Sequence, residues 1–197
     1  DAATDDDARA QARDILKLLG EAKLLDPIRD GELTGMVVLR EALAYASPLA
    51  DAVYALQALG SIPLILASED PLSDDASRDA AQALRDEWLD HAIEGRAMAA
   101  FAMTEPEAGS DVASIGTTAR LDGADYVLDG RKVFISNAGI ADYYIVFATV
   151  DAERGKEGLT CFVVYAGIDG MRFVRPQVMS APHPLGELEF DGCRVPV

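Results

Sequence analysis

The spacing of apolar residues divides the chain into two halves with different periods. From about residue 8 to about residue 100, apolar side chains recur at the three- and four-residue intervals typical of amphipathic helices. Ser47-Pro48 has the signature of a helix start, a capping side chain followed by proline at the first helical position. Gly60 and Gly95 are the expected helix ends, and the chain after Gly60 is expected to begin a separate short helix.

The helical half is expected to bury one face of each helix and to expose one acidic loop. That loop spans Glu69 to Ala76 and contains Pro71. His91 lies on the last helix and is expected to be a surface or half-buried residue, because it lacks partners for chemistry. The first helix is expected to pack through its apolar side chains, which are Ile15, Leu18, Leu19 and Ala22.

From about residue 97 the apolar period shortens to two, which is typical of strands. Asp122-Gly123 and Asp129-Gly130 are strong hairpin signals between short strands, and Asp169-Gly170 and Asp191-Gly192 indicate further turns. We expect an α+β chain, with a helical N-terminal domain over 1–98 and a small β-barrel or sandwich over 99–197. The expected strands are Thr117–Leu121, Tyr126–Leu128, Lys132–Ile135, Tyr143–Val150 and Leu159–Tyr165.

Charge and composition narrow the possible partners. The 34 acidic residues outnumber the 17 basic ones, giving a net charge of −17, which argues against nucleic acid. A phosphate-bearing cofactor would therefore have to be held by backbone N–H groups and hydroxyls. Cys161 is expected to be a buried thiol, and the two cysteines and two histidines are too few for a zinc site. No apolar run approaches the ~18 residues of a membrane helix, so a cytoplasmic protein without a membrane span is expected.

The segment between the two halves, Phe101 to Asp111, carries the candidate chemistry. Thr104, Ser110 and Asp111 offer side-chain oxygens, and Gly109 permits close approach of a ligand to the backbone. Consecutive N–H groups in such a loop can bind an anion. Taken alone, a loop of this composition is more often simply a turn.

The sequence of this segment resembles the acyl-CoA dehydrogenase family. Met103 to Val112 resembles the first signature of the family, and Gly130 to Asn137 resembles its second flavin segment, at the expected spacing. Gly158 to Val164 and Leu188 to Pro196 also fit, the latter resembling the stretch before the family's C-terminal helical domain. The resemblance covers about residues 15 to 197 and is most specific in the β half.

This resemblance implies FAD as cofactor and an acyl-CoA as substrate, with Ser110 touching both. Met103 and Thr104 would lie near the pyrimidine side of the flavin, and Gly109 near the pyrophosphate. Phe134 stands where the family usually has Trp, and Ser136 where it usually has Thr; both keep a suitable aromatic ring or hydroxyl. The implied cofactor-binding residues are Phe101, Met103, Thr104, Gly109, Ser110, Phe134, Ile135 and Ser136.

The implied activity is oxidation of an acyl-CoA to the 2,3-enoyl-CoA, with an electron-transfer flavoprotein as acceptor. The family's glutamate base belongs to a C-terminal helical domain expected after Val197, so no catalytic residue is assigned here; Glu105 and Asp111 are expected to make turn and cap hydrogen bonds. A homo-oligomer or a partner chain supplying that domain is expected to cover an exposed apolar face. The alternatives are an oxidase or monooxygenase of the same fold, a non-catalytic binding subunit, and a β-domain that has lost FAD.

Overall fold

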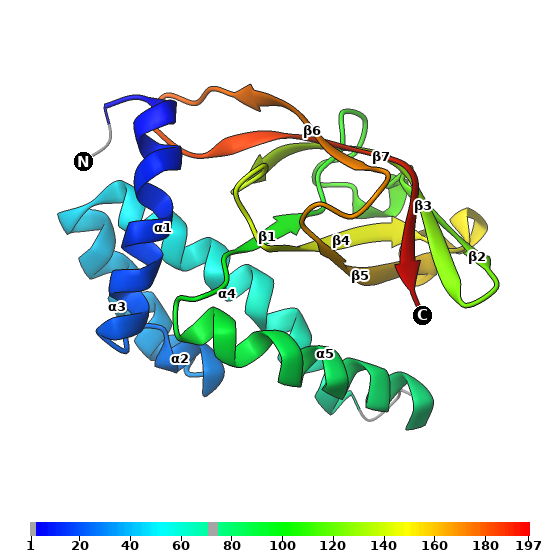
Figure 1. Ribbon diagram of the computed structural model, residues 1–197, viewed down its shortest axis with the longest axis horizontal. Helices are drawn as coiled ribbons and strands as arrows, with labels where there is room; N and C mark the ends of the chain where they lie inside the picture. The colour runs from blue at the N-terminus through cyan, green and yellow to red at the C-terminus, as the bar shows by residue number, and fades with distance from the viewer. Residues whose placement is uncertain (1–2, 71–74) are drawn as a thin grey trace. The chain divides into compact units, whose positions relative to one another are not determined.

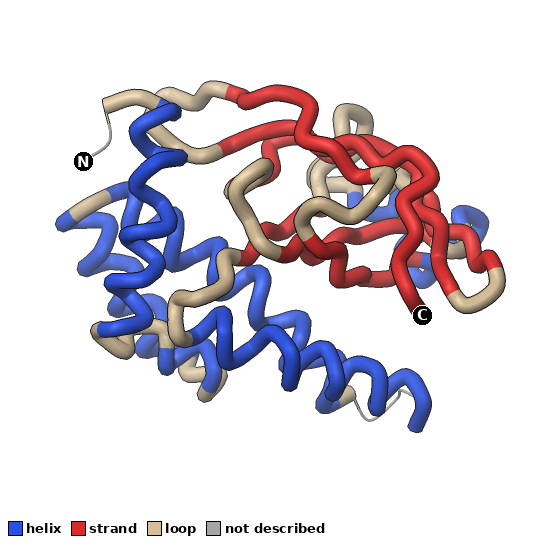
Figure 2. The backbone as a smooth tube through the Cα atoms, in the orientation of Figure 1, coloured by secondary structure: helices blue, strands red, loops and turns tan. Residues whose placement is uncertain are grey.

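A computed structural model describes residues 3–70 and 75–197 and divides the chain into two compact units. The first comprises Asp1–Ala99 together with Ser180–Pro184, and the second comprises Ala100–Met179 together with Leu185–Val197. Helices dominate the first unit and strands dominate the second (Figures 1 and 2). This arrangement confirms the expected α+β class.

The helical unit is built on α1 (Asp5–Glu21), α2 (Asp26–Arg29), α3 (Leu33–Ala46), α4 (Pro48–Glu69) and α5 (Asp75–Ile93). Two helix starts are fixed by side-chain caps. Thr4 and Asp7 form a reciprocal capping box at α1, and the Ser47 hydroxyl accepts from the Ala50 N–H at α4. The start expected at Ser47-Pro48 is therefore confirmed. Of the expected loop from Glu69 to Ala76, residues 71–74 lie outside the described residues, while Glu69 ends α4 and Asp75 and Ala76 begin α5 instead of lying in a loop.

Helix α4 is the core helix of this unit, and it does not end at Gly60 as expected. It continues to Glu69 with Pro63 inside it, and it packs against α1, α2, α3 and α5. Pro63 removes one helical hydrogen bond, which costs free energy in isolation, but packing of α4 against four other helices outweighs that local preference. With 22 residues, α4 is long and apolar enough to cross a membrane, a criterion that the core helix of a soluble protein also meets. The expectation that no apolar stretch approaches the length of a membrane helix was therefore wrong.

Helix α1 buries a different face from the one expected. Leu19 is buried, but Leu18 is 63% exposed and Ala22 is also exposed. Small alanines take the inner positions because they allow the helix to approach its neighbours closely. The buried face consists of Ala8, Ala12, Leu16 and Leu19.

The connection between the last two strands belongs to the helical unit. Ser180–Pro184 packs there, and the His183 N–H donates to the Asp5 carboxylate at 3.1 Å. The pKa of His183 is lowered, mainly by burial and to a smaller extent by Arg9, and the nearby Asp5 carboxylate offsets only part of this effect. The division of the chain into units is therefore not a single cut in the sequence.

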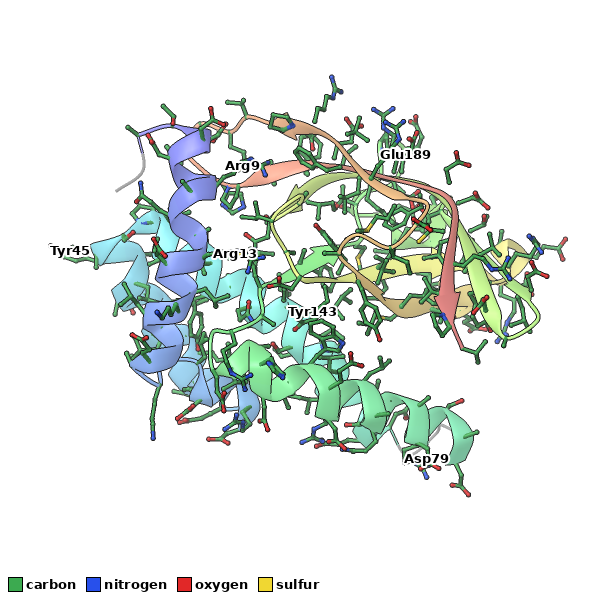
Figure 3. The ribbon with its side chains drawn as sticks, viewed as in Figure 1. Arg9, Arg13, Tyr45, Asp79, Tyr143 and Glu189 are labelled. Carbon is green, nitrogen blue, oxygen red and sulfur yellow. The ribbon has the colours of Figure 1, made fainter. Side chains whose placement is uncertain are left out.

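The β unit is a seven-stranded mixed sheet in the order β1-β4-β2-β3-β7-β6, with β5 paired to β4. Its core includes Tyr143, Ile145, Leu128 and Leu188, all of them fully or almost fully buried. Tyr143 is labelled in Figure 3. The strands are β1 (Ala99–Ala102), β2 (Thr118–Asp122), β3 (Asp125–Ser136), β4 (Tyr143–Thr149), β5 (Leu159–Tyr165), β6 (Met171–Gln177) and β7 (Leu185–Pro196).

Two of the four expected Asp-Gly turns are bulges within long strands. Asp122-Gly123 does join β2 and β3 as an antiparallel hairpin, and Asp169-Gly170 lies between β5 and β6. Asp129-Gly130, however, lies inside β3, and Asp191-Gly192 lies opposite it inside β7. The register shifts there, and the Gly192 N–H donates to the Asp129 carboxylate at 2.7 Å. The same glycine that favours a tight turn also favours a bulge, so the dipeptide alone cannot distinguish them.

Cys161 is placed differently from the expectation. Cys161 lies on the exposed face of β5, whereas Cys193 on β7 is fully buried. Burial, with a smaller contribution from Asp129, raises the pKa of Cys193 to about 11, so its thiol stays protonated and unreactive at neutral pH.

Candidate functional site

The two sequence segments singled out as candidate chemistry lie side by side in the β unit. The Val133 N–H donates to the Thr104 carbonyl at 2.9 Å. The Lys132 ammonium donates to the Met103 carbonyl at 3.0 Å. Two neighbouring bonds, at Met103 and Thr104, thus tie the chain after β1 to β3 next to Phe134.

A buried ion pair completes this connection. The Lys132 ammonium, fully buried, donates to the Glu105 carboxylate at 2.7 Å. The same carboxylate accepts from the N–H groups of Gly116 and Thr117 at 2.7 and 3.0 Å. Glu105 was expected to make turn hydrogen bonds, whereas here its carboxylate anchors a second segment. Lys132 was not among the predicted site residues, although it lies in the segment Gly130 to Asn137 that resembles the family's second flavin segment; lysine is rarely fully buried unless paired.

The pKa values of this pair reflect a balance between burial and bonding. Burial raises the pKa of Glu105, but the hydrogen bonds from Lys132, Thr117 and Gly116 outweigh it and leave the pKa lowered. Burial lowers the pKa of Lys132, and the Glu105 carboxylate offsets only part of that effect. Glu105 is therefore ionised at neutral pH, and its bonds to the backbone persist there.

Phe134 is the most unusual residue of the site. Its φ is +56°, a left-handed conformation that aromatic residues rarely adopt, and its side chain is 61% exposed. It lies at a register shift between Lys132 and Ile135, where β3 bulges against β7. Its N–H donates to the Gln177 side-chain carbonyl at 2.6 Å, which holds the bulge from β6. Strain of this kind that leaves a large apolar ring in solvent indicates a binding position.

The loop after Met103 presents hydrogen-bond donors without protein partners. Among residues 3–70 and 75–197, neither the N–H nor the hydroxyl of Thr104 and Ser110 has a partner, nor has the Gly109 N–H. A side chain built at Gly109 would meet nothing within 4 Å, so the space above this backbone is open. The turn itself is closed by the Glu105 N–H on the Ala108 carbonyl at 2.8 Å. These donors are available to a ligand.

The remaining predicted residues take supporting positions. Phe101, on β1, packs its ring against Phe147 with centroids 5.1 Å apart. Ile135 is 1% exposed, so only its main chain faces any ligand, while Ser136 is half-buried at the end of β3. Asp111 accepts from the Ser114 hydroxyl at 2.6 Å, a local turn bond of the kind expected for it.

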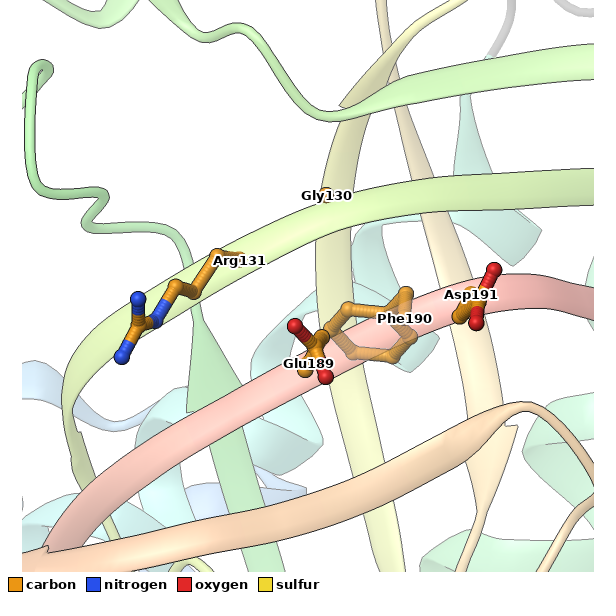
Figure 4. Close-up of a pocket in the computed structure, with 5 residues that line it drawn as sticks. All are labelled: Gly130, Arg131, Glu189, Phe190 and Asp191. Atoms are coloured by element: carbon orange, nitrogen blue, oxygen red, sulfur yellow. The ribbon is translucent and has the colours of Figure 1, made fainter.

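A shallow pocket of about 300 Å³ lies elsewhere on the sheet, around the paired bulges of β3 and β7 (Figure 4). It is lined by Gly130, Arg131, Glu189, Phe190 and Asp191, and none of the predicted cofactor-binding residues contributes to it. Its charged side chains carry both signs, and Arg131 is already paired with Glu187. We therefore assign no ligand to it.

Comparison with known proteins identifies the family and the fold. Residues 100–193 match the family model of the acyl-CoA dehydrogenase middle domain. The chain is 44% identical to the 3-(aryl)acrylate reductase of Clostridium sporogenes over 93 residues, and this aligned stretch covers 47% of the chain and 25% of the relative. It is 35% identical over 162 residues to the probable acyl-CoA dehydrogenase FadE25 of Mycobacterium tuberculosis, 81% of the chain and 38% of the relative.

A solved structure extends the likeness to both units. The acyl-CoA dehydrogenase of Bacillus anthracis, in complex with FAD, aligns with a TM-score of 0.77 and 25% identity over 95% of this chain and 32% of its own. The fold is that of the helical N-terminal and β middle domains of a flavoprotein dehydrogenase. The chain belongs to the acyl-CoA dehydrogenase family, and it spans a quarter to two fifths of the curated relatives described above.

Proposed function

We propose that this chain binds FAD through the segments 103–110 and 134–136 and forms the flavin-binding part of an enzyme that oxidises an acyl-CoA to the 2,3-enoyl-CoA. The observation that carries the proposal is Phe134 on β3, which combines a strained backbone with an exposed ring and follows Val133, the residue bonded to Thr104. Family membership and the FAD complex of a structural relative support it.

The donor set fits a dinucleotide in an acidic protein. With a net charge of −17, the chain would hold the pyrophosphate through main-chain N–H groups and the Ser110 hydroxyl, which have no partner among the described residues. Phe134 would offer its ring face to the flavin, and Thr104 and Ser136 would offer hydroxyls to its polar edge. FAD, when bound, accepts the hydride from the substrate β-carbon; the protein supplies binding, orientation and hydrogen-bond donors.

The rest of the catalytic machinery belongs outside these residues. No carboxylate of the chain matches the family's base, and Glu105 is buried and committed to Lys132. We therefore place the base in a C-terminal helical domain, supplied by the same protein or by a partner chain, and propose an electron-transfer flavoprotein as acceptor. Helix α3 exposes a surface that such a domain or an oligomer would cover: Leu33, Val37, Val38 and Tyr45, of which Tyr45 is 97% exposed (Figure 3).

Other functions of the same fold remain as second candidates. The relatives include an acrylate reductase and an L-prolyl-[peptidyl-carrier protein] dehydrogenase, so neither the direction of the reaction nor the carrier of the acyl group is common to all of them. An oxidase or monooxygenase would differ from a dehydrogenase in the reactivity of its reduced flavin with oxygen. A non-catalytic binding subunit would bind FAD without turning over a substrate.

The test is anaerobic titration of the full-length gene product with acyl-CoA thioesters of several chain lengths. The expected result is a flavin absorbance that bleaches with at least one of them. Rapid reoxidation of the bleached flavin when air is admitted favours an oxidase, and bound flavin that no thioester bleaches favours the binding subunit. A colourless protein that takes up no added FAD would contradict the cofactor assignment itself.

A further inference from the structure

The buried Glu105–Lys132 pair is bonded to the main chain that carries the proposed flavin donors. The Lys132 ammonium divides its bonds between the Glu105 carboxylate at 2.7 Å and the Met103 carbonyl at 3.0 Å. The bond from Lys132 to the Met103 carbonyl was not expected from the sequence. It links a buried charge to the peptide at the centre of the site.

That peptide couples the charge to the ligand side. The Met103 carbonyl and the Thr104 N–H are the two ends of one planar peptide group. A charged donor on the carbonyl polarises the group and strengthens its N–H as a donor. In the described part of the chain, the Thr104 N–H has no partner of its own. The Lys132 charge is therefore transmitted to a donor that is open to a ligand.

Stability alone does not explain why a charged pair occupies this position. Lys132 is fully buried and Glu105 is 8% exposed, so both have lost most of their hydration. Apolar side chains of similar volume often give equal or greater stability than a buried ion pair. The pair does supply something that an apolar pair cannot, namely a fixed positive charge on the Met103 carbonyl and a fixed acceptor for the amides of Gly116 and Thr117.

We propose that Lys132 is a positioning residue that orients and polarises the Met103–Thr104 peptide toward the flavin, with Glu105 as the group that holds Lys132 in place. The inference rests on the proposed function, because the ligand of the Thr104 N–H is taken to be FAD. Electron density added to the flavin on reduction is stabilised by nearby donors and positive charge. Lys132 therefore raises the midpoint potential of the bound flavin, and Glu105 moderates it.

The two members of the pair have opposite expected effects, which a purely structural role would not give. Lys132→Met removes the charge from the Met103 carbonyl, so it lowers the flavin potential and weakens FAD binding about tenfold, the value of one charge-assisted bond. Glu105→Gln keeps an acceptor for the two amides and removes a negative charge, so it raises the potential. Loss of packing alone would shift both variants in the same direction.

The experiment measures the midpoint potential and FAD dissociation constant of the full-length protein in four forms. These are the wild type, Lys132→Met, Glu105→Gln and the control Arg194→Met, which removes an exposed arginine paired with Asp122 and Asp125 on the same sheet. Circular dichroism checks that each variant folds. Potentials that move in opposite directions for Lys132→Met and Glu105→Gln, with no shift in the control, support the inference.

Two results would overturn it. One is a Lys132→Met protein that binds FAD with the affinity and potential of the control; the other is a shift of both pair variants in the same direction. If Lys132→Met does not fold, Glu105→Gln decides, since an unchanged potential there contradicts the role of the pair. A wild type that binds no FAD would remove the proposed function together with this inference, whereas the first two results leave the proposed function intact.

Discussion

At Phe134 the backbone conformation and the side-chain exposure are both unfavourable for the isolated protein. A left-handed conformation costs a non-glycine residue roughly 1–2 kcal/mol, and 61% of this large apolar side chain faces solvent. Gln177 stabilises the conformation by accepting the Phe134 N–H at 2.6 Å. A ligand that covers the ring would offset the exposure, which is why we place the flavin there.

Two substitutions at Phe134 separate strain from stacking. Phe134→Gly removes the ring and relieves the left-handed strain, whereas Phe134→Ala removes the ring and keeps the strain. We expect both variants to bind FAD about fivefold more weakly, because stacking is lost. The free energy of unfolding should be about 1 kcal/mol higher for Phe134→Gly than for Phe134→Ala. Chemical denaturation and FAD titration measure the two effects. Unchanged FAD affinity in both variants would remove Phe134 from the site.

The sequence indicated candidate residues for the site but not the forces that arrange them. Thr104, Ser110 and Phe134 were proposed from a motif, and in the structure Thr104 lies beside the Phe134 segment because Met103 and Thr104 are bonded to Lys132 and Val133. A buried lysine, an amide contact from Gln177 and a left-handed φ depend on tertiary packing. Residue patterns along one strand carry no information about the neighbouring strand that supplies these partners.

At the scale of elements, helix α4 shows how a polar residue can organise an apolar core. Gln57 is fully buried on α4, and its amide nitrogen donates to the carbonyls of Ala92 and Ala97 at 3.0 and 2.8 Å. Its carbonyl accepts from the Ala99 N–H at 3.1 Å. Gln57 thus holds the chain at the end of α5 and at the first residue of β1, the strand that leads to Met103.

Replacing Gln57 with leucine should destabilise the protein strongly, because its three hydrogen bonds to backbone groups are lost in a buried place. We expect a loss of about 3 kcal/mol in the free energy of unfolding, on the basis of roughly 1 kcal/mol for each of the three lost hydrogen bonds. Gln82→Leu is the matched control, since Gln82 makes an exposed bond to Asp86 on α5. Denaturant titration of the two variants should separate them clearly, and equal stabilities would contradict the role of Gln57.

The elements also show where local signals are ambiguous. The helix start at Ser47-Pro48 and the hairpin at Asp122-Gly123 were predicted correctly, because caps and tight turns depend on adjacent residues. The helix end at Gly60 was not, since packing on several sides of α4 outweighs a glycine and a proline. The bulge at Asp129-Gly130 was taken for a turn, because its partner bulge lies about 60 residues further along the chain.

At the scale of the whole chain, charge and family give a consistent account of how a dinucleotide would be held. Thirty-four acidic residues and 17 basic ones leave little positive charge for phosphates, and the open donors at 104 and 109–110 are main-chain amides and hydroxyls. The fold class could be predicted from the change of apolar period near residue 97. The assignment of Ser180–Pro184 to the helical unit could not, because no local pattern marks that packing.

Hydrogen–deuterium exchange of the full-length protein, with and without FAD, tests the central claim most directly. The account predicts slower exchange on FAD addition in two separate peptides, one covering residues 103–110 and the other covering residues 133–136. Protection confined to other peptides, with exchange in these two unchanged although FAD is bound, would contradict it.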